Sequence, residues 1–433
     1  MYDIIIIGGG VSGLVARREL SQRGFKVLLL EAKNRLGGRA WTGDFDDEKI
    51  EFGGGYVYWS QPHVWSEINR YDLKIKERPN KASGFASKNV CWLRNGILEK
   101  DFDASVGATL EKAYLDFIEP ARDAFPRPFE PFFTEKFKQY DSVSATEYIN
   151  SMPDLSDFQR DGLLRTTAVM FHNDPAKGSY MEALRWFALS FFNMEIYGDS
   201  LSGFTFQDGT DSLIQPLIKD GKGKILLNTI VEKIEQNSDF VSVFSTKKAF
   251  LAKKIIIATP LNTWKNIDFF PKLSIEKTEL SKEEHTGKGL KIYVKVKGEF
   301  PISRCAATLD QAFISILPHR VASESSTIII FTNPMQPLEM LDKATIQAHL
   351  QRFDESLEVI DFTCHDWNTD IFSLGTWCSL RPKQFTKYFP KAQQPEGNIY
   401  FAGADIANGW RGFIDGAIES GIRVANQIIK FNL

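Results

Sequence analysis

The chain has 433 residues and a formal net charge of −3 at pH 7, with 52 Lys and Arg against 55 Asp and Glu. This balance excludes the basic surface of a nucleic-acid-binding protein, and no apolar run reaches the roughly 20 residues that a membrane-spanning helix needs. The length allows two or three domain-sized units with large cores. Four widely spaced cysteines form no CxxC pair, and the first predicted strand leaves no room for a signal peptide. We therefore expect a cytoplasmic protein without a membrane anchor.

The first thirty residues predict a strand, a glycine-rich turn, a helix and a second strand. Residues 3–7 form an apolar run long enough for one buried strand, and a second run fills residues 26–30. Between them, residues 8–13 read GGGVSG and supply the three glycines of GxGxxG. These glycines allow the turn, the approach of a pyrophosphate and close packing of helix on strand, while the helix N-terminus favours an anion. Glu31, at the end of the second strand, can accept hydrogen bonds from a ribose hydroxyl, so the sequence predicts a dinucleotide site.

Two further glycine-rich stretches follow. Gly37-Gly38-Arg39 places two adjacent glycines before an arginine, and residues 51–56 read EFGGGY. Adjacent glycines let the backbone pass close to a flat or anionic group, and the Arg39 guanidinium suits a phosphate. Both stretches extend the predicted cofactor site beyond the first strand and helix.

The segment EAKNRLGGRAWT at residues 31–42 resembles the second signature of the flavin-containing amine oxidases, in which this segment lies along FAD. An NAD-binding Rossmann domain does not need the segment, so the resemblance implies FAD. Residues 58–65, YWSQPHVW, look like the bacterial branch that acts on nicotine, pseudooxynicotine and related N-methylated amines. The resemblance continues in FAGADIANGWRGFIDGAIESGIRVA at residues 401–425.

The expected FAD contacts combine the glycine-rich stretches with positions carried over from the family: Gly8, Gly10, Val11, Ser12, Gly13, Glu31, Ala32, Gly37, Gly38, Arg39, Gly53, Gly54, Gly55, Tyr56, Val231, Ala258, Thr259, Gly403, Asp405, Gly412, Phe413 and Ile414. In the family, the backbone at the position of Val231 meets the adenine, and the acid near Asp405 meets the ribityl-pyrophosphate. The helix that starts near Ile414 points its amides at the flavin N1/O2 edge, where charge collects on reduction. Members with covalent FAD carry a cysteine where this chain has Thr376 or Gly375, so we expect non-covalent FAD.

The rest of the chain alternates between helical and strand patterns. Residues 90–96 predict a short hairpin, and helical periodicity dominates from residue 104 to residue 194, including a stripe from 180 to 194. Three prolines between residues 125 and 133 exclude regular helix there, which leaves an entrance lid or a connection held to the core by its phenylalanines. Strands are predicted at residues 230–234, 239–245, 249–258, 290–298 and 398–402, with helices at 341–353 and before residue 429.

These elements predict an α/β protein, α+β overall, of the amine-oxidase type. A discontinuous Rossmann-like FAD-binding domain should be threaded through a mixed-sheet and helical substrate domain. We expect the FAD-binding domain in residues 1–77, 204–282 and 371–433, with the last part also forming a wall of the active site. The substrate domain should take residues 78–203, with a helical insertion over the substrate, and residues 283–370.

Lys291 has two readings. Residues 290–298 alternate strictly between apolar and polar side chains, which by itself places Lys291 on a solvated strand face. However, GKGLK at residues 287–291 resembles the family segment whose lysine holds a water against the flavin N5 atom. The resemblance therefore makes Lys291 a candidate catalytic residue.

Family members frame the amine between two aromatic rings in front of the flavin. The resemblance points to Trp377 and Phe413, with Phe413 in place of the tyrosine common there. Trp59 is a candidate for closing the pocket, and Trp410 or Arg411 could reach the same space. The tryptophans also fit ordinary core positions, because core packing explains most aromatic residues.

The resemblance implies FAD-dependent oxidation of the C–N bond of a secondary or tertiary amine, N-methylated amines included. Hydride transfer to flavin N5 gives an imine that water hydrolyses, and the electron acceptor is oxygen or a redox protein. Two alternatives stay open: a non-catalytic flavin-binding subunit, and an L-amino-acid-oxidase-like enzyme whose cavity arginine would be Arg165, Arg185, Arg381 or Arg411. No metal site is expected, a homodimer is left open, and the six histidines fit ordinary surface or core positions.

Overall fold

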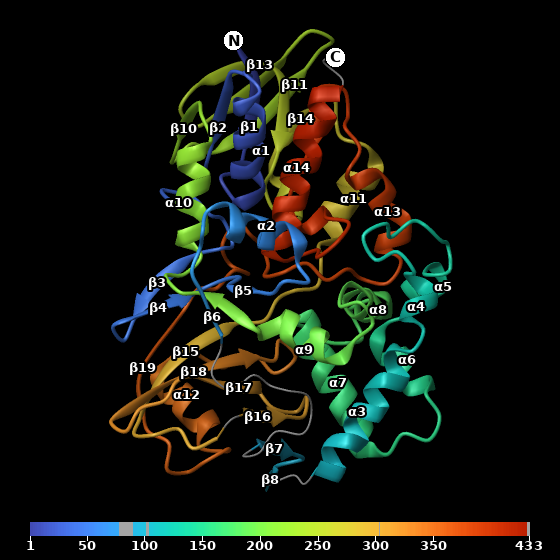
Figure 1. The fold of residues 1–433 in the computed structure, drawn as a ribbon, viewed down its shortest axis with the longest axis vertical. Coiled ribbons are helices and arrows are strands. Elements are labelled where there is room, and N and C mark those ends of the chain that lie inside the picture. The colour runs from blue at the N-terminus through green and yellow to red at the C-terminus, as the bar shows by residue number, and fades with distance from the viewer. Residues whose placement is uncertain (78–89, 101–103, 303, 431–433) are drawn as a thin grey trace.

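The structure, a computed structural model, describes residues 1–77, 90–100, 104–302 and 304–430. Figure 1 shows three groups of elements: a large sheet with flanking helices at the top, a second sheet at the lower left, and a cluster of helices at the lower right. The first strand and the last helix both belong to the upper group, so the chain leaves this group and returns to it. None of the helices within the described residues has the length and apolar character needed to cross a bilayer.

The first sheet collects strands that are far apart in the sequence. Its strands are β1 (Tyr2–Ile7), β2 (Val27–Leu30), β10 (Lys224–Leu226), β11 (Val231–Gln236), β12 (Val241–Ser245), β13 (Ala249–Ile257), β14 (Asp268–Phe270) and β20 (Ile399–Phe401). Their order is β10-β2-β1-β13-β12-β11-β14, and β20 also pairs with β13. The strands β10, β2, β1, β13 and β20 run parallel to one another.

Both faces of the parallel strands are buried, which explains their continuous apolar sequences. Ile4 and Ile6 of β1 belong to the core on one face, whereas Ile5 and Ile7 belong to the core on the other. The helices of the upper group are α1 (Val11–Gln22), α2 (Pro62–Arg70), α10 (Asp211–Asp220), α11 (Ile275–Glu283), α13 (Gln384–Ala392) and α14 (Ile414–Lys430). The strand–turn–helix–strand expected for the first thirty residues is confirmed as β1, α1 and β2.

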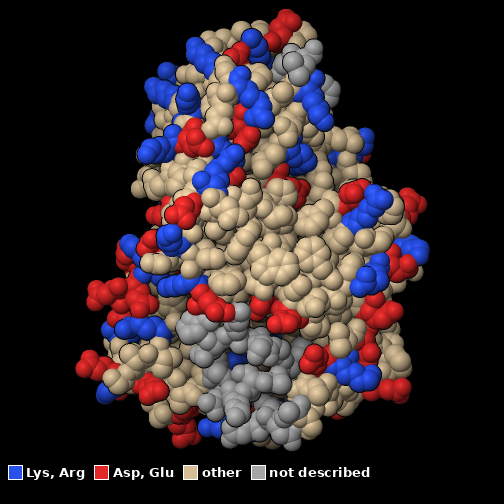
Figure 2. Space-filling model, in the orientation of Figure 1, with Lys and Arg blue, Asp and Glu red and all other residues tan. Residues whose placement is uncertain are grey.

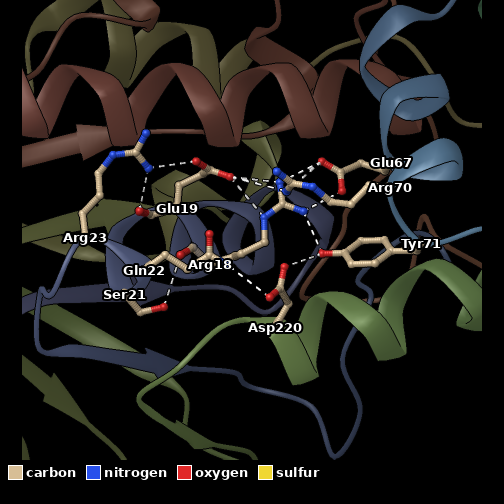
Figure 3. A network of polar contacts seen from close by, with 9 residues as sticks. All are labelled: Arg18, Glu19, Ser21, Gln22, Arg23, Glu67, Arg70, Tyr71 and Asp220. Carbon is tan, nitrogen blue, oxygen red and sulfur yellow. Dashed lines mark hydrogen bonds and ion pairs between the residues drawn. The ribbon is translucent and has the colours of Figure 1, made fainter.

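A polar network ties α1, α2 and α10 together (Figure 3). Arg18 of α1 donates from Nη1 and Nη2 to the two carboxylate oxygens of Glu67 at 2.5 and 2.7 Å, and both side chains are buried. Arg18 also donates to the hydroxyl of Tyr71, which donates in turn to Asp220 at 2.9 Å. Burial alone would lower the pKa of Arg18, but its hydrogen bonds and charge interaction with Glu67 raise that pKa above its usual value. The bidentate pair therefore fixes α2 on α1.

The second sheet has the order β19-β15-β18-β17-β16-β7-β8. Its strands are β7 (Val90–Arg94), β8 (Ile97–Lys100), β15 (Lys291–Lys297), β16 (Arg304–Ala307), β17 (Phe313–Arg320), β18 (Ser325–Thr332) and β19 (Val359–Cys364), with α12 (Lys343–Leu350) nearby. The hairpin expected at residues 90–96 is confirmed as β7 and β8. On β15, Ile292 and Val294 pack into the core that contains α12, while the side chains of Lys291 and Tyr293 belong to the opposite face.

Smaller elements connect the two sheets. A hairpin is formed by β3 (Thr42–Phe45) and β4 (Glu48–Glu51), and a three-stranded sheet by β5 (Tyr56–Val57), β6 (Ile75–Glu77) and β9 (Phe204–Phe206). The first sheet thus takes its strands from residues 1–77, 204–282 and 371–433, and the second sheet from residues 78–203 and 283–370. The exact domain boundaries remain a prediction.

The helical group has seven helices within the described residues: α3 (Ala104–Ile118), α4 (Ala121–Ala124), α5 (Lys138–Asp141), α6 (Ala145–Ser151), α7 (Asp157–Phe171), α8 (Tyr180–Leu189) and α9 (Met194–Ser202). The single helical stripe expected at residues 180–194 is wrong in its second half. Helix α8 ends at Leu189, because Phe191 and Phe192 take φ values of 56° and 58°, which a right-handed helix does not allow.

The proline-containing stretch at residues 125–133 has no regular helix, as expected. Phe125 is buried, and the ring of Phe132 stacks on Phe385 of α13, with 4.9 Å between the centroids. None of the residues from 125 to 133 lines the cavity described next. Of the two readings, this geometry favours a connection held to the core over an entrance lid.

Candidate active site

A cavity of ≈ 650 Å³ runs from the first sheet to the second sheet and the helical group. At one end it meets Ile7, Leu30 and Ala258, which lie at or just beyond the carboxyl ends of β1, β2 and β13. At the other end it is lined by residues of α7, β15, β16 and β17. The carboxyl edge of parallel strands is where ligands bind in open α/β sheets, so the first end is a cofactor site by topology.

The backbone around the first end is packed too closely for side chains. Gly8 has a φ of 105°, and a Cβ there would lie 2.8 Å from the carbonyl oxygen of Ala258. A Cβ on Gly38 would lie 3.0 Å from the Cα of Gly10. Helix α1 begins directly after Gly10 with no side-chain cap, so its first N–H groups are available to an anion.

Two hydroxyls in this region are suited to a ligand. Ser12 Oγ and Thr259 Oγ1 are buried and have no hydrogen-bond partner among the residues that the structure describes. Both residues line the cavity. Because buried polar groups are almost always hydrogen-bonded, these hydroxyls and the glycine backbone fit a bound dinucleotide.

Glu31 lies at the cavity edge after β2 and is 8% exposed. Its Oε2 accepts the N–H of Gly9 at 2.6 Å, and its Oε1 accepts the N–H of Lys33 at 2.8 Å. Burial raises the pKa of Glu31 despite these two hydrogen bonds. The carboxylate therefore already organises the turn, and its remaining lone pairs are available to a ribose.

The cavity gathers most of the expected FAD contacts: Gly8, Gly10, Val11, Ser12, Glu31, Ala32, Gly37, Gly38, Arg39, Gly53, Gly54, Gly55, Tyr56, Val231, Ala258, Thr259, Gly403, Gly412, Phe413 and Ile414. Gly13 does not line it, and a Cβ there would lie 2.1 Å from the carbonyl oxygen of Gly8, so this position packs α1 on β1.

Asp405 also lies outside the cavity lining, and its contact with the cofactor stays a prediction. Its buried carboxylate accepts a hydrogen bond from Arg39 Nη2 at 2.6 Å and from the N–H of Leu261 at 3.0 Å. Burial acts to raise the pKa of Asp405, but the Arg39 charge helps to hold that pKa below its usual value. Arg39 donates as well to the carbonyl oxygen of Thr376 at 2.5 Å. Asp405 is therefore placed to fix Arg39, which itself lines the cavity.

Lys291, at the start of β15, lines the cavity and is half-buried. Its Nζ donates to the carbonyl oxygen of Gly53 at 2.7 Å, so the side chain points toward the glycine-rich segment before β5. Apolar and polar side chains alternate along β15 as predicted. However, the polar side chain of its first residue, Lys291, faces the cavity instead of solvent. Lys288 does not line the cavity; its Nζ binds Glu284 and the carbonyl oxygen of Leu374, both at 2.7 Å.

Two of the predicted aromatic residues, Trp377 and Phe413, line the cavity. Trp377 donates from Nε1 to the carbonyl oxygen of Met170 at 2.8 Å, and its ring stacks on His172 at 4.3 Å with an interplanar angle of 7°. Phe413 packs edge-on against Trp186, with 5.1 Å between the centroids. Both rings are therefore fixed by neighbours from the helical group.

The other two predicted aromatic residues lie elsewhere. Trp59 is 44% exposed and stacks on Phe191, with 6.1 Å between the centroids. Figure 2 shows a broad area without charged side chains in the middle of the face that it draws, in the region where Figure 1 draws α2 and α9. Trp410 is fully buried, 5.0 Å from the ring of Phe413, and donates to the carbonyl oxygen of Ser60. Neither lines the cavity, so Trp59 is a surface residue and Trp410 supports Phe413 from behind.

His172 corrects the expectation that every histidine is an ordinary surface or core residue. It lines the cavity at the end of α7, with a φ of 51°, and its Nδ1 lies 3.2 Å from the hydroxyl of Thr376. Burial lowers its pKa to about 3, so the ring is neutral near pH 7. The sequence carries no signal for its stacking on Trp377, because residues 172 and 377 meet through tertiary packing alone. Arg304 and Trp186 also line the cavity and were not expected there.

A dinucleotide site at the edge of a Rossmann-like sheet, open to a pocket with aromatic walls, defines the protein as a nucleotide-cofactor oxidoreductase. The model of the flavin containing amine oxidoreductases matches residues 11–429, and the chain belongs to this family. It is an enzyme that acts on amines, with FAD as its cofactor.

Individual relatives agree with this assignment. The chain is 37% identical to a pseudooxynicotine dehydrogenase of a Pseudomonas species over 434 residues, covering 99% of this chain and 86% of that protein. It is 29% identical to the (S)-6-hydroxynicotine oxidase of Paenarthrobacter nicotinovorans, covering 99% of this chain and all of that protein. Among solved structures, the cyclohexylamine oxidase of Brevibacterium oxydans has a TM-score of 0.81 at 19% identity, covering 100% of this chain and 99% of that one. That likeness confirms the predicted amine-oxidase fold.

The buried histidines predict that acid destabilises the protein. Burial lowers the pKa of His172 to about 3 and that of His285 to about 4, below the usual value of about 6.5. As the pH falls from 6.5 toward 4, the unfolded chain binds protons that the folded protein does not, so stability falls in this window. At pH 5 the loss should be about 2 kcal/mol per histidine relative to pH 7.5.

Thermal unfolding with excess FAD at pH 7.5 and 5 would check this loss. Asparagine tolerates the positive φ of position 172, so His172→Asn is a suitable variant. The variant should lose about 2 kcal/mol less than the parent between the two pH values. An equal loss in parent and variant would show that His172 is protonated in the folded protein.

Proposed function

We propose that the enzyme oxidises the C–N bond of a secondary or tertiary amine, N-methylated amines included. The observation that carries the proposal is the placement of Trp377, Phe413 and Lys291 on one cavity with the glycine-rich cofactor site. The names of the relatives point the same way, because nicotine and pseudooxynicotine are N-methylated amines. FAD, when bound, supplies the acceptor for the hydride, which carries the two electrons that the amine loses.

The cavity favours a neutral amine. Phe413, Trp377 and Phe331 give it apolar walls, and Lys291 adds positive charge. Low polarity and neighbouring cations both lower the pKa of a bound amine. A neutral nitrogen keeps its lone pair, so no side-chain base is needed to start the oxidation. The oxidised product is an imine, or an iminium ion when the amine is tertiary, and water converts it to a carbonyl compound and an amine.

The cysteines support non-covalent FAD. None of the four, all within the described residues, lines the cavity. Cys378 is fully buried, with its Sγ 3.7 Å from the carbonyl oxygen of Asp405. Thr376, two positions before it, lines the cavity and cannot form the thioether that a cysteine would. The oxygen or redox-protein acceptor, a homodimer and a cytoplasmic location remain predictions.

The amino-acid-oxidase alternative is less well supported. Of its four candidate arginines, Arg165 alone lines the cavity. Arg185 donates to the carbonyl oxygens of residues 408 and 409, Arg381 to those of residues 283 and 284, and Arg411 pairs with Glu182. The non-catalytic alternative leaves the orientation of Lys291 and Trp377 toward the cavity unexplained.

Product analysis after a single anaerobic turnover tests the proposal. Mixing with one N-methylated secondary amine should consume one amine per reduced flavin. It should release, in equal amount, either methylamine with the matching aldehyde or ketone, or formaldehyde with the demethylated amine. Flavin reduction without any C–N cleavage product would contradict it.

Lys291→Met should slow reoxidation of the flavin by oxygen more than its reduction by an amine. The reason is that Lys291 Nζ lies in the cavity on Gly53, where a water beside the cofactor would be held. Stopped-flow measurement of the two half-reactions separates the effects, and Lys288→Met serves as a control outside the cavity. Traces identical to the parent in both half-reactions would remove Lys291 from the mechanism.

A further inference from the structure

Two arginines line the cavity at its second-sheet end. Arg165 lies on α7 and Arg304 lies at the start of β16. The other cationic side chain on this sheet that lines the cavity, Lys291, is on β15, next to the cofactor segment. In the sheet order, β18 and β17 separate β15 from β16.

The sheet register places these side chains on one face. Lys291 pairs with Phe331 and Phe331 pairs with Ser315, and all three line the cavity. Cys305 pairs with Ile316, so Arg304 is in register with Leu317, which also lines the cavity. Three strand spacings of about 4.8 Å, or roughly 14 Å across the sheet, separate the strand of Lys291 from the strand of Arg304, and Arg304 also lies two residues farther along the sheet. An apolar surface of Phe331 and Leu317 lies between the two ends.

Arg165 has an unusual environment for a cation. Its Nε donates to the carbonyl oxygen of Ile314 at 3.0 Å, and within the described residues no carboxylate forms an ion pair with it. Burial, and secondly the charge of Arg304, lower the pKa of Arg165 to about 9, so it is still charged at pH 7. The positive charge of Arg165 therefore faces the cavity, where it suits an anionic group of a ligand.

We infer that the substrate carries a carboxylate at the end opposite its reacting amine, and that Arg165 and Arg304 bind this carboxylate. The inference rests on the proposed function, because it takes the amine end to be at Trp377 and Phe413. Guanidinium groups match a carboxylate in shape and charge. An α-amino acid holds its carboxylate one carbon from the nitrogen, whereas Arg304 lies three strands away from Lys291. With the N-alkylated amine of the proposed function, the substrate class is therefore an amine with several carbons between nitrogen and carboxylate.

A matched pair of probes tests this. 6-(Methylamino)hexanoate carries the carboxylate, and its methyl ester has the same chain without the charge. From saturation of anaerobic flavin reduction, the acid should show a dissociation constant at least tenfold below that of the ester. Arg165→Met and Arg304→Met should each remove most of this difference and leave the ester within about twofold. Arg160→Met, on the same helix but outside the cavity lining, should leave both constants unchanged.

An inert ligand gives a second readout that does not depend on turnover. Hexanoate should bind the FAD-loaded protein in isothermal titration calorimetry and raise its unfolding temperature, whereas 1-hexanol at the same concentration should do so much less. Equal binding of acid and ester by the parent enzyme would overturn the carboxylate inference alone. If neither probe reduces the flavin, the proposed function fails, while hexanoate binding still reports on the two arginines.

Discussion

Glu31→Ala should raise the dissociation constant of FAD by about tenfold to a hundredfold. The loss corresponds to the 1.5–3 kcal/mol typical of hydrogen bonds to a charged group, on the order of one to two decades in affinity. Part of it comes from the turn, because Glu31 also accepts the N–H groups of Gly9 and Lys33. Titration of FAD into apo-protein, monitored by flavin fluorescence, measures the change.

The protein as purified, before FAD is removed, tests whether FAD is covalent, because acid precipitation should leave the yellow colour in the supernatant. Glu31→Gln serves as the matched variant, since it keeps the size and one acceptor oxygen and should lose less affinity than Glu31→Ala. An unchanged dissociation constant in Glu31→Ala would mean that Glu31 does not bind the ribose. Colour retained in the pellet would overturn non-covalent binding.

Trp377→Ala should slow flavin reduction by an N-methylated amine about tenfold to a hundredfold, which is about 1.4–2.7 kcal/mol in the activation free energy. Met170 and His172 hold the ring in place, so its removal takes away one wall of the cavity and leaves the substrate less well oriented. Trp377→Phe, which keeps a ring, should recover part of the rate. Stopped-flow absorbance under anaerobic conditions is the measurement.

Trp59→Ala is the control for this experiment. Trp59 is exposed and outside the cavity lining, so its removal should change the rate less than twofold. The reduction rate of the parent should also rise with pH through the pKa of the bound amine, because the neutral form reacts. A larger loss in Trp59→Ala than in Trp377→Ala would reverse the assignment of the two residues.

The cofactor half of the site could be predicted because its signals are local. The isoleucine run of β1 and the glycines at 8, 10 and 13 lie within one strand–turn–helix unit, whose backbone geometry follows from the residue types. The position of Lys291 could be predicted only from two signals together. The alternation along β15 indicated on which face of the strand the side chain lies, and the resemblance indicated that this face meets the cofactor.

The substrate half could be predicted only in part. Trp59 and Trp410 lie in loops, where no periodicity fixes the direction of a side chain, and packing turned one outward and buried the other. Arg165 belongs to α7 and His172 follows its last residue, and the position of α7 against β17 depends on contacts between distant segments. The buried Asp405 was assigned to the cofactor by its place in the chain, although its partner, Arg39, lies 366 residues away.

The central claim is tested most directly by mixing the purified protein anaerobically with matched amines and amino acids and following the flavin absorbance. We expect N-methylated secondary and tertiary amines to bleach the flavin quickly, and those with a distant carboxylate to do so at the lowest concentrations. The α-amino acids should leave the flavin oxidised. Rapid bleaching by α-amino acids, with N-methylated amines inert, would contradict the account.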